Sequence, residues 1–130
     1  MRVHESAGCT AFPYVEVQHA RRKSVSDQSS SISKAFQVFM TDAPRHAQAW
    51  SGMVQGLASA SALDGKTAAL AYLAVLAALR LESGVPFHVQ QAKQRGASRD
   101  EVISAILIGL PAAGHSVTQV LPAAIAAYDA

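Results

Sequence analysis

The sequence contains little cysteine: Cys9 is the single one among its 130 residues. One cysteine cannot form a disulfide within the chain, so the class of small secreted folds held together by disulfides is excluded. We therefore expect a cytoplasmic protein. Cys9 itself is interpreted as an ordinary small residue of a tail, because it lies far along the sequence from every other candidate site residue.

Charge is also scarce, since only 15% of the residues are Asp, Glu, Lys or Arg. The net charge is +2, and the one basic cluster is the run 21–23, which is too short to indicate binding of nucleic acid. Half of the residues are apolar. A small monomer with so few charges has difficulty covering its surface with polar groups, so we expect a homo-oligomer.

Long hydrophobic runs are missing as well. The longest, AALAYLAVLAAL at 68–79, has twelve residues and lies between Lys66 and Arg80, whereas a bilayer requires about 20. The first residues mix charges with apolar side chains, unlike a signal peptide. We expect no membrane segment and interpret 68–79 as part of a buried helix.

The histidines do not have the spacing of metal ligands. They are His4, His19, His46, His88 and His115. No two of them are three or four residues apart, the spacing that places two ligands on one face of a helix. We expect neither a metal nor another cofactor.

The composition changes near residue 33. Residues 1–33 include SVSDQSSSIS, a serine-rich stretch typical of linkers, and are expected to form an N-terminal arm. A short extended segment is possible within it around TAFPYVEVQH, where Pro13 argues against a central strand. Residues 34–130 have helical patterns and are expected to form one helical domain.

Six helices are expected in that domain, which makes the fold all-α. The first surrounds AFQVFM and ends near Thr41, and Asp42 with Pro44 marks the start of the second. Asp64 caps the third, from about Gly65 to Leu81, which is apolar on nearly every face and should be surrounded by protein.

The C-terminal half contains the other three helices. The fourth runs from about 86 to 95 and ends at Gly96, a glycine C-cap. Ser98 and Glu101 form a capping box that starts the fifth. Pro111 and Gly114 mark a break before the last helix, whose apolar stripe is Val117, Val120, Leu121, Ala124 and Tyr128.

The stretch ESGVPFH at 82–88 separates the third and fourth helices. Val85 precedes a proline and is biased away from helical dihedrals, while Pro86 suits the first position of a helix. His88 then lies in the first turn, where the helix dipole favours a neutral ring that could accept a proton or donate its N–H to a substrate oxygen. A single histidine at a helix start is also commonly structural.

The run from Leu63 to about Tyr128 resembles the carboxymuconolactone decarboxylase family, which includes the alkylhydroperoxidase D-like enzymes. The matching features are LDGKT, PFHVQQAKQRGASRDEV and GLPAAGH. The resemblance implies an all-α bundle that assembles into trimers or hexamers.

The redox branch of that family has a Glu, a Cys-x-x-Cys pair and a His at fixed spacing. Aligned on His88, the two cysteine positions are Leu81 and Gly84, and the Glu position is Ala69. Neither an aliphatic side chain nor a hydrogen atom can be oxidised to a mixed disulfide. We therefore expect no thiol peroxidase activity at this position.

The decarboxylase branch implies acid/base chemistry on a small organic acid or lactone. The candidates are His88 and His115 as catalytic groups, Glu82 as a neighbouring carboxylate, and Arg80 and Gly84 as substrate-binding residues. Each also has a structural interpretation, as a junction, interface or capping residue. Two hypotheses follow, a cysteine-free enzyme of the decarboxylase type and a catalytically degraded oligomeric binding protein. An alkylhydroperoxidase-like antioxidant protein is a weaker third.

Overall fold

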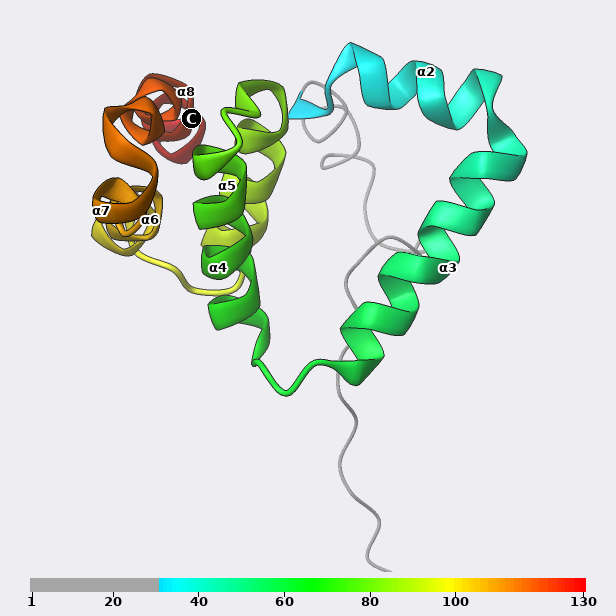
Figure 1. Ribbon diagram of the computed structural model, residues 1–130, viewed down its shortest axis with the longest axis horizontal. Helices are drawn as coiled ribbons and strands as arrows, with labels where there is room; N and C mark the ends of the chain where they lie inside the picture. Colours follow the sequence, from blue (N-terminus) through cyan, green and yellow to red (C-terminus); the bar gives the residue numbers. More distant parts are fainter. Residues whose placement is uncertain (1–30) are drawn as a thin grey trace, which may run out of the picture.

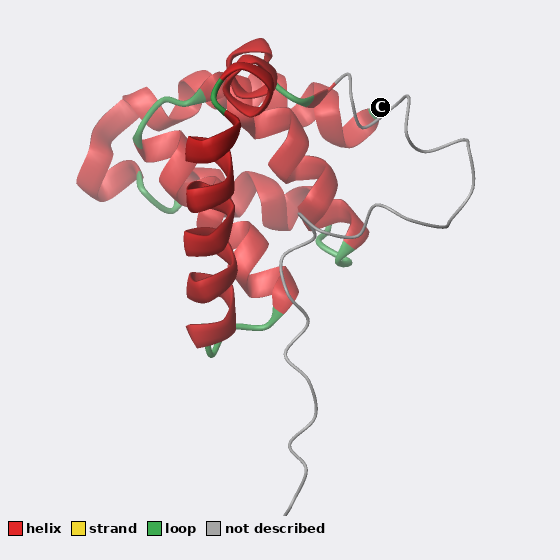
Figure 2. Cartoon of the chain, turned by 90° about the vertical axis from the view of Figure 1, so that its right-hand side faces the viewer, coloured by secondary structure: helices red, strands yellow, loops and turns green. Residues whose placement is uncertain are grey.

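The part of the chain that the computed structural model describes, residues 31–130, is all-α, as predicted, and has no strand (Figures 1 and 2). Each of the six expected helices is present, together with a one-turn helix and two 3-10 helices. In chain order the elements are α2 (Lys34–Asp42), α3 (Pro44–Ala60), α4 (Gly65–Ala78), η1 (Glu82–Gly84), α5 (Val85–Gln94), α6 (Arg99–Leu107), α7 (Leu110–Ala113), η2 (Gly114–Val120) and α8 (Leu121–Asp129).

The expected N-terminal arm, 1–33, lies outside the described residues except for its last three. Cys9, His4 and His19 lie outside them as well, so the interpretations of these residues stay predictions. Ser33 is the N-cap of α2 and accepts a hydrogen bond from the Phe36 N–H at 3.2 Å.

The hydrophobic core belongs to α4–α8. Helix α4 packs against α5 and α6, and α8 packs against the same two helices. Removing a fully buried aliphatic side chain from such a core costs about 2–5 kcal/mol. The largest fully buried side chains are Leu73, Ile106, Val85, Val89, Val102, Val117 and Val120.

The last third of the chain folds back on itself. By length and composition alone, Arg99–Asp129 is apolar enough to cross a membrane. However, Gly114 ends α7 with φ of 75°, a backbone conformation that favours glycine, and α6 packs against α8. The predicted break in this segment is therefore confirmed, and Val117, Val120 and Ala124 of the predicted stripe are fully buried.

Helices α2 and α3 extend away from this core (Figure 1). They pack mainly against each other, and Phe36 and Phe39 of α2 contact Trp50 of α3 edge-on at ring-centroid distances of 5.4 and 6.2 Å. Along the 17 residues of α3, only Ala47 and Ala58 are buried. This pair of helices therefore depends on few contacts with the rest of the chain.

Two of the three predicted N-terminal caps are confirmed. Asp64 accepts a hydrogen bond from the Thr67 N–H at 3.0 Å, and Ser98 and Glu101 form both hydrogen bonds of the capping box. The cap predicted at Asp42 is wrong. Helix α2 continues through Asp42, which leaves only Ala43 as the N-cap of α3, without a side-chain hydrogen bond.

Helix α4 ends at Ala78, three residues earlier than predicted, in a Schellman motif. The Leu81 N–H donates to the Leu76 carbonyl at 2.9 Å and the Arg80 N–H donates to the Ala77 carbonyl at 3.1 Å. The motif requires a left-handed residue, and Arg80 adopts it with φ of 57°. The sequence offered no signal here, because an arginine seldom takes the position that glycine prefers.

Helix α5 ends in the same motif, this time with the predicted glycine. The Ala97 N–H donates to the Ala92 carbonyl and the Gly96 N–H to the Lys93 carbonyl, both at 3.0 Å. Gly96 has φ of 87°, and a Cβ added to it would meet no atom within 4 Å. A side chain at this position would therefore meet no steric clash, and only the left-handed backbone dihedral disfavours it.

These two turns give a matched pair of stability predictions. We expect Arg80→Gly to raise the free energy of unfolding by about 1 kcal/mol, because it removes left-handed strain, and Gly96→Ala to lower it by about 1 kcal/mol, because it introduces that strain. Urea unfolding followed by circular dichroism measures both. A loss of stability in Arg80→Gly would contradict the strain argument.

Candidate functional site

His88 lies on α5, one turn after the helix begins. Val85 is the first residue of α5, with helical dihedrals of −63° and −46°, and Pro86 follows it in the first turn. The predicted bias of Val85 away from the helix is therefore wrong. Its side chain is fully buried in the core, and this packing outweighs a local preference.

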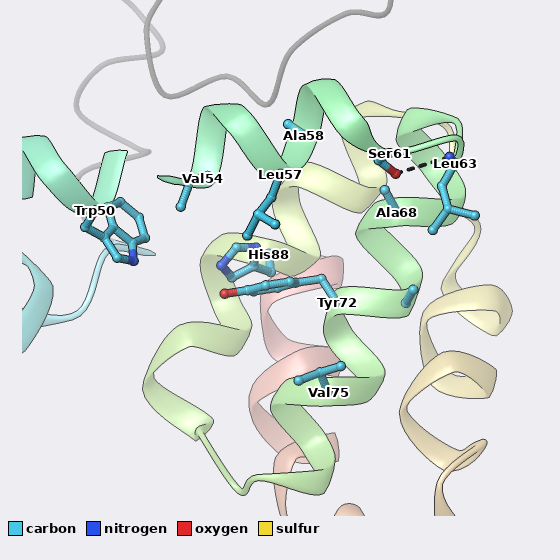
Figure 3. A pocket seen from close by; sticks show the side chains of 11 residues that line it. Trp50, Val54, Leu57, Ala58, Ser61, Leu63, Ala68, Tyr72, Val75 and His88 are labelled. Atoms are coloured by element: carbon cyan, nitrogen blue, oxygen red, sulfur yellow. Dashed lines mark hydrogen bonds between the residues drawn. The ribbon is translucent and has the colours of Figure 1, made fainter. Parts of the chain in front are cut away.

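Two aromatic rings enclose the imidazole of His88. The Tyr72 ring from α4 lies with its centroid 4.4 Å away at a tilt of 42°, and the neighbouring Phe87 ring lies edge-on at 5.2 Å. Figure 3 shows the Tyr72 hydroxyl and one ring nitrogen of His88 at the same end of this pair. The hydroxyl and the imidazole can therefore act on the same ligand.

Burial lowers the pKa of His88 from 6.5 to about 4, and the positive charge of Arg95 contributes to the same direction. This lowered pKa agrees with the neutral His88 ring that the sequence predicts. The main cause is desolvation of the imidazolium, however, and not the helix dipole. At neutral pH His88 has one N–H donor and one free acceptor nitrogen.

A cavity of about 330 Å³ lies between α3 and α4, with His88 at one end (Figure 3). Its walls are almost entirely aliphatic or aromatic. Side-chain polar atoms come from four residues only, Trp50, Ser61, Tyr72 and His88. The lining residues are Trp50, Val54, Leu57, Ala58, Ser61, Leu63, Ala68, Ala71, Tyr72, Val75 and His88.

A second cavity, of about 200 Å³, shares Trp50, Tyr72 and His88 with the first. Its other walls come from residues 32–36 at the start of α2, from the segment between α4 and α5, and from Leu76 of α4 and Phe87 of α5. The segment between α4 and α5 includes Leu81 and Gly84, the two positions that the family resemblance aligned with redox cysteines. The two cavities thus meet at the Tyr72–His88 pair.

The structure brings together only two of the five sequence candidates. His88 and Gly84 both line the second cavity. Arg80 is exposed in the turn after α4, Glu82 is exposed in η1, and His115 is exposed in η2; none of these three is among the lining residues of either cavity.

Sequence reasoning missed Trp50 and Tyr72, which define the site with His88. Tyr72 is the one aromatic residue in the apolar run 68–79, and Trp50 is the one tryptophan of a chain with 6% aromatic residues. Both were visible as isolated aromatic residues. Their proximity to His88 depends on how α3, α4 and α5 pack, which no local pattern specifies.

The described residues contain no group of three or more His, Cys, Asp or Glu side chains that could hold a metal ion. The histidine at the cavity stands among aromatic and aliphatic neighbours. The ionisable side chains that line the larger cavity are His88 and Tyr72.

The first prediction for this site concerns its protonation. In an NMR titration the His88 imidazole of the native protein should change protonation near pH 4. Tyr72→Ala exposes the ring to water, so we expect the His88 midpoint to rise toward 6.5. An unchanged midpoint in this variant would contradict the assignment of the shift to burial.

The same shift predicts a pH dependence of stability. Between pH 6.5 and 4 the unfolded state binds a proton at His88 that the folded state does not, so the free energy of unfolding falls as the pH falls through this window. We expect a loss on the order of 2 kcal/mol. His88→Gln should remove this contribution, measured by urea unfolding at pH 7 and pH 4.5.

Comparison with known proteins agrees with the all-α fold. Neither the curated proteins nor the solved structures gave a match. The family model described as "Carboxymuconolactone decarboxylase family" matches residues 44–126, from the start of α3 into α8. This is well over half of the chain, and it includes His88, Tyr72 and Trp50. The chain belongs to the carboxymuconolactone decarboxylase family.

Proposed function

We propose that this protein is a cysteine-independent member of its family that binds a small, neutral, largely apolar carbonyl compound, such as a lactone, over His88 and acts on it by acid/base chemistry. The observation that supports this proposal is the neutral imidazole of His88 at the end of an apolar cavity. Such a cavity favours an apolar ligand, and the imidazole supplies one directional polar contact.

The cavity favours a lactone over a free organic acid. Of the described residues that line the two cavities, none is Lys, Arg, Asp or Glu. A carboxylate placed there would lose its hydration without gaining a cationic partner, which costs several kcal/mol. Arg80, the cation expected to hold an acid, is exposed in the turn after α4 and does not line a cavity.

His88 has a defined part in this proposal. A neutral imidazole donates its N–H to the carbonyl oxygen of the ligand, and the hydrogen bond strengthens as negative charge develops on that oxygen. This assists addition of water to the carbonyl carbon, after which the ring C–O bond breaks and the proton of that water passes to the leaving oxygen. It equally assists transfer of a proton from the adjacent carbon to a water molecule. The Tyr72 hydroxyl, at the same end of the ring pair, is a second donor for that oxygen.

The alternative is a binding protein of the same fold that has lost catalysis. One observation favours it: Glu82 and His115, the other acid/base candidates, are both exposed and outside the two cavities. A histidine with a pKa of about 4 is a weak base at neutral pH. In this alternative His88 binds the ligand through one hydrogen bond and no turnover follows.

Thiol-dependent peroxidase chemistry is not part of the proposal, because Leu81 and Gly84 supply no sulfur beside His88. We also propose that the protein is a homo-oligomer, because half of its residues are apolar and few are charged. A cytoplasmic location stays a prediction from the sequence.

A matched pair of ligands tests the preference for a neutral ligand. Dihydrocoumarin is a neutral aromatic lactone, and its ring-opened hydroxy acid has the same carbon skeleton with a negative charge. By isothermal titration calorimetry we expect the lactone to bind at least tenfold more tightly. Tighter binding of the acid would contradict a neutral substrate.

Histidine variants test the role of His88. We expect His88→Ala to weaken lactone binding about tenfold, the loss of one hydrogen bond worth about 1.4 kcal/mol. The control is His115→Ala, which changes an exposed histidine outside the cavities and should leave affinity unchanged. Two reactions distinguish an enzyme from a binding protein: opening of the lactone, and deuterium exchange at the carbon beside its carbonyl. For an enzyme, the native protein accelerates one of them and His88→Ala loses that acceleration. For a binding protein, neither reaction exceeds its rate without protein.

A further inference from the structure

The two cavities that meet at Tyr72 and His88 have walls of different chemistry. Away from Trp50, Tyr72 and His88, the lining of the larger cavity is aliphatic except for Ser61. The second cavity is lined largely by rings. Of the six Phe, Trp and Tyr residues in the described part of the chain, four line it. Its rings are Phe36, Trp50, Tyr72, Phe87 and the imidazole of His88.

The larger cavity is long and narrow. Its lining residues on α3 run from Trp50 to Ser61, which is about 16 Å along a helix. Figure 3 shows Ser61 and Leu63 at the opposite end of this cavity from Trp50. A volume of about 330 Å³ spread over that length leaves room for a hydrocarbon chain and not for a stack of fused rings.

The second cavity has the size and the walls for one flat ring. Its volume of about 200 Å³ is close to that of apolar cavities that hold benzene, about 150 Å³. Aromatic rings attract a flat ring that lies offset or edge-on to them. Phe36 and Trp50, whose centroids are 5.4 Å apart, supply such walls on one side, and Phe87 supplies another.

We infer that the ligand of this site has two parts, a flat six-membered lactone ring in the second cavity and an unbranched alkyl chain in the larger one. A 6-alkyl-2-pyrone has this form. Its carbonyl and its chain flank the ring oxygen, so both point toward the junction of the cavities while the ring lies among the aromatic walls. The carbonyl contact with His88 rests on the proposed function, whereas the division of the ligand between two cavities rests on their walls.

A series of 6-alkyl-2-pyrones, from methyl to undecyl, tests the position of the chain. Trp50 is the one tryptophan of the sequence and lines both cavities, so its fluorescence measures binding. We expect affinity to rise about twofold to fourfold for each methylene. The rise should stop at roughly ten carbons, where the chain reaches Ser61. Equal affinities for the methyl and nonyl compounds would overturn the inference.

A variant at the far end of the larger cavity should shorten the chain that fits. Ala68 lines this cavity at the end away from His88 (Figure 3). Ala68→Leu should weaken binding of 6-nonyl-2-pyrone about tenfold, because it displaces the end of the chain, and leave 6-methyl-2-pyrone unchanged. The control is Ala78→Leu, on the exposed side of the same helix and outside both cavities, which should change neither. An undiminished affinity of Ala68→Leu for the nonyl compound would place the chain elsewhere and overturn the inference.

Two phenylalanines of α2 provide a matched test of the ring. Phe36 and Phe39 both contact Trp50, but Phe36 lines the second cavity and Phe39 lines neither. Phe36→Leu should weaken binding of 6-pentyl-2-pyrone about fivefold. It should affect δ-decalactone less, because that lactone has the same skeleton with a puckered, saturated ring. Phe39→Leu should change neither affinity, and equal effects of the two variants would contradict the placement of the ring.

Pentylbenzene separates this inference from the proposed function, because it has the flat ring and the chain but no carbonyl. We expect it to bind about tenfold more weakly than 6-pentyl-2-pyrone. If the two bind equally, the carbonyl contact of the proposed function fails while the division between the cavities stands. If dihydrocoumarin binds and added chains contribute nothing, the proposed function stands and this inference fails.

Discussion

The structure depends on one constraint, the absence of charge on α4 between Lys66 and Arg80. A helix that is apolar on all sides needs burial on all sides. The bundle satisfies this on one side, where Leu73 and Ala77 are fully buried against α5 and α6. The other side presents Tyr72 and Val75 to a cavity and remains half exposed. The core and the cavity are therefore both consequences of one helix.

The electrostatics of the site follow from the same constraint. Because the walls around His88 are hydrocarbon and aromatic, charging the ring is costly, and burial lowers the pKa of His88 to about 4. A site of this kind stabilises hydrogen-bonded neutral groups and disfavours bound carboxylates. Leu81 and Gly84, which the family resemblance aligns with redox cysteines, border the second cavity beside the same ring.

Features set by neighbouring residues could be predicted, and features set by packing could not. Asp64, the Ser98–Glu101 capping box and Gly96 were found because a cap depends on a side chain reaching its own helix end. Arg80 in a left-handed turn and the helical Val85 were not. The backbone hydrogen bonds of the Schellman motif hold Arg80 in a conformation that its residue type disfavours, and core packing overrides the local preference of Val85. In the site, His88 could be predicted from the residues next to it in the sequence. Trp50 and Tyr72 come from other helices, so no local sequence pattern predicts that they lie close to His88.

By itself the sequence determined the helical class, most of the helix boundaries and the lack of sulfur at Leu81 and Gly84. Each of these depends on residue type and on spacing within a few residues. Only the tertiary structure decided that the Tyr72 ring lies against His88 and that Arg80, Glu82 and His115 stay outside the cavities. Those relations depend on the packing of helices distant in sequence, which hydrophobic periodicity does not specify.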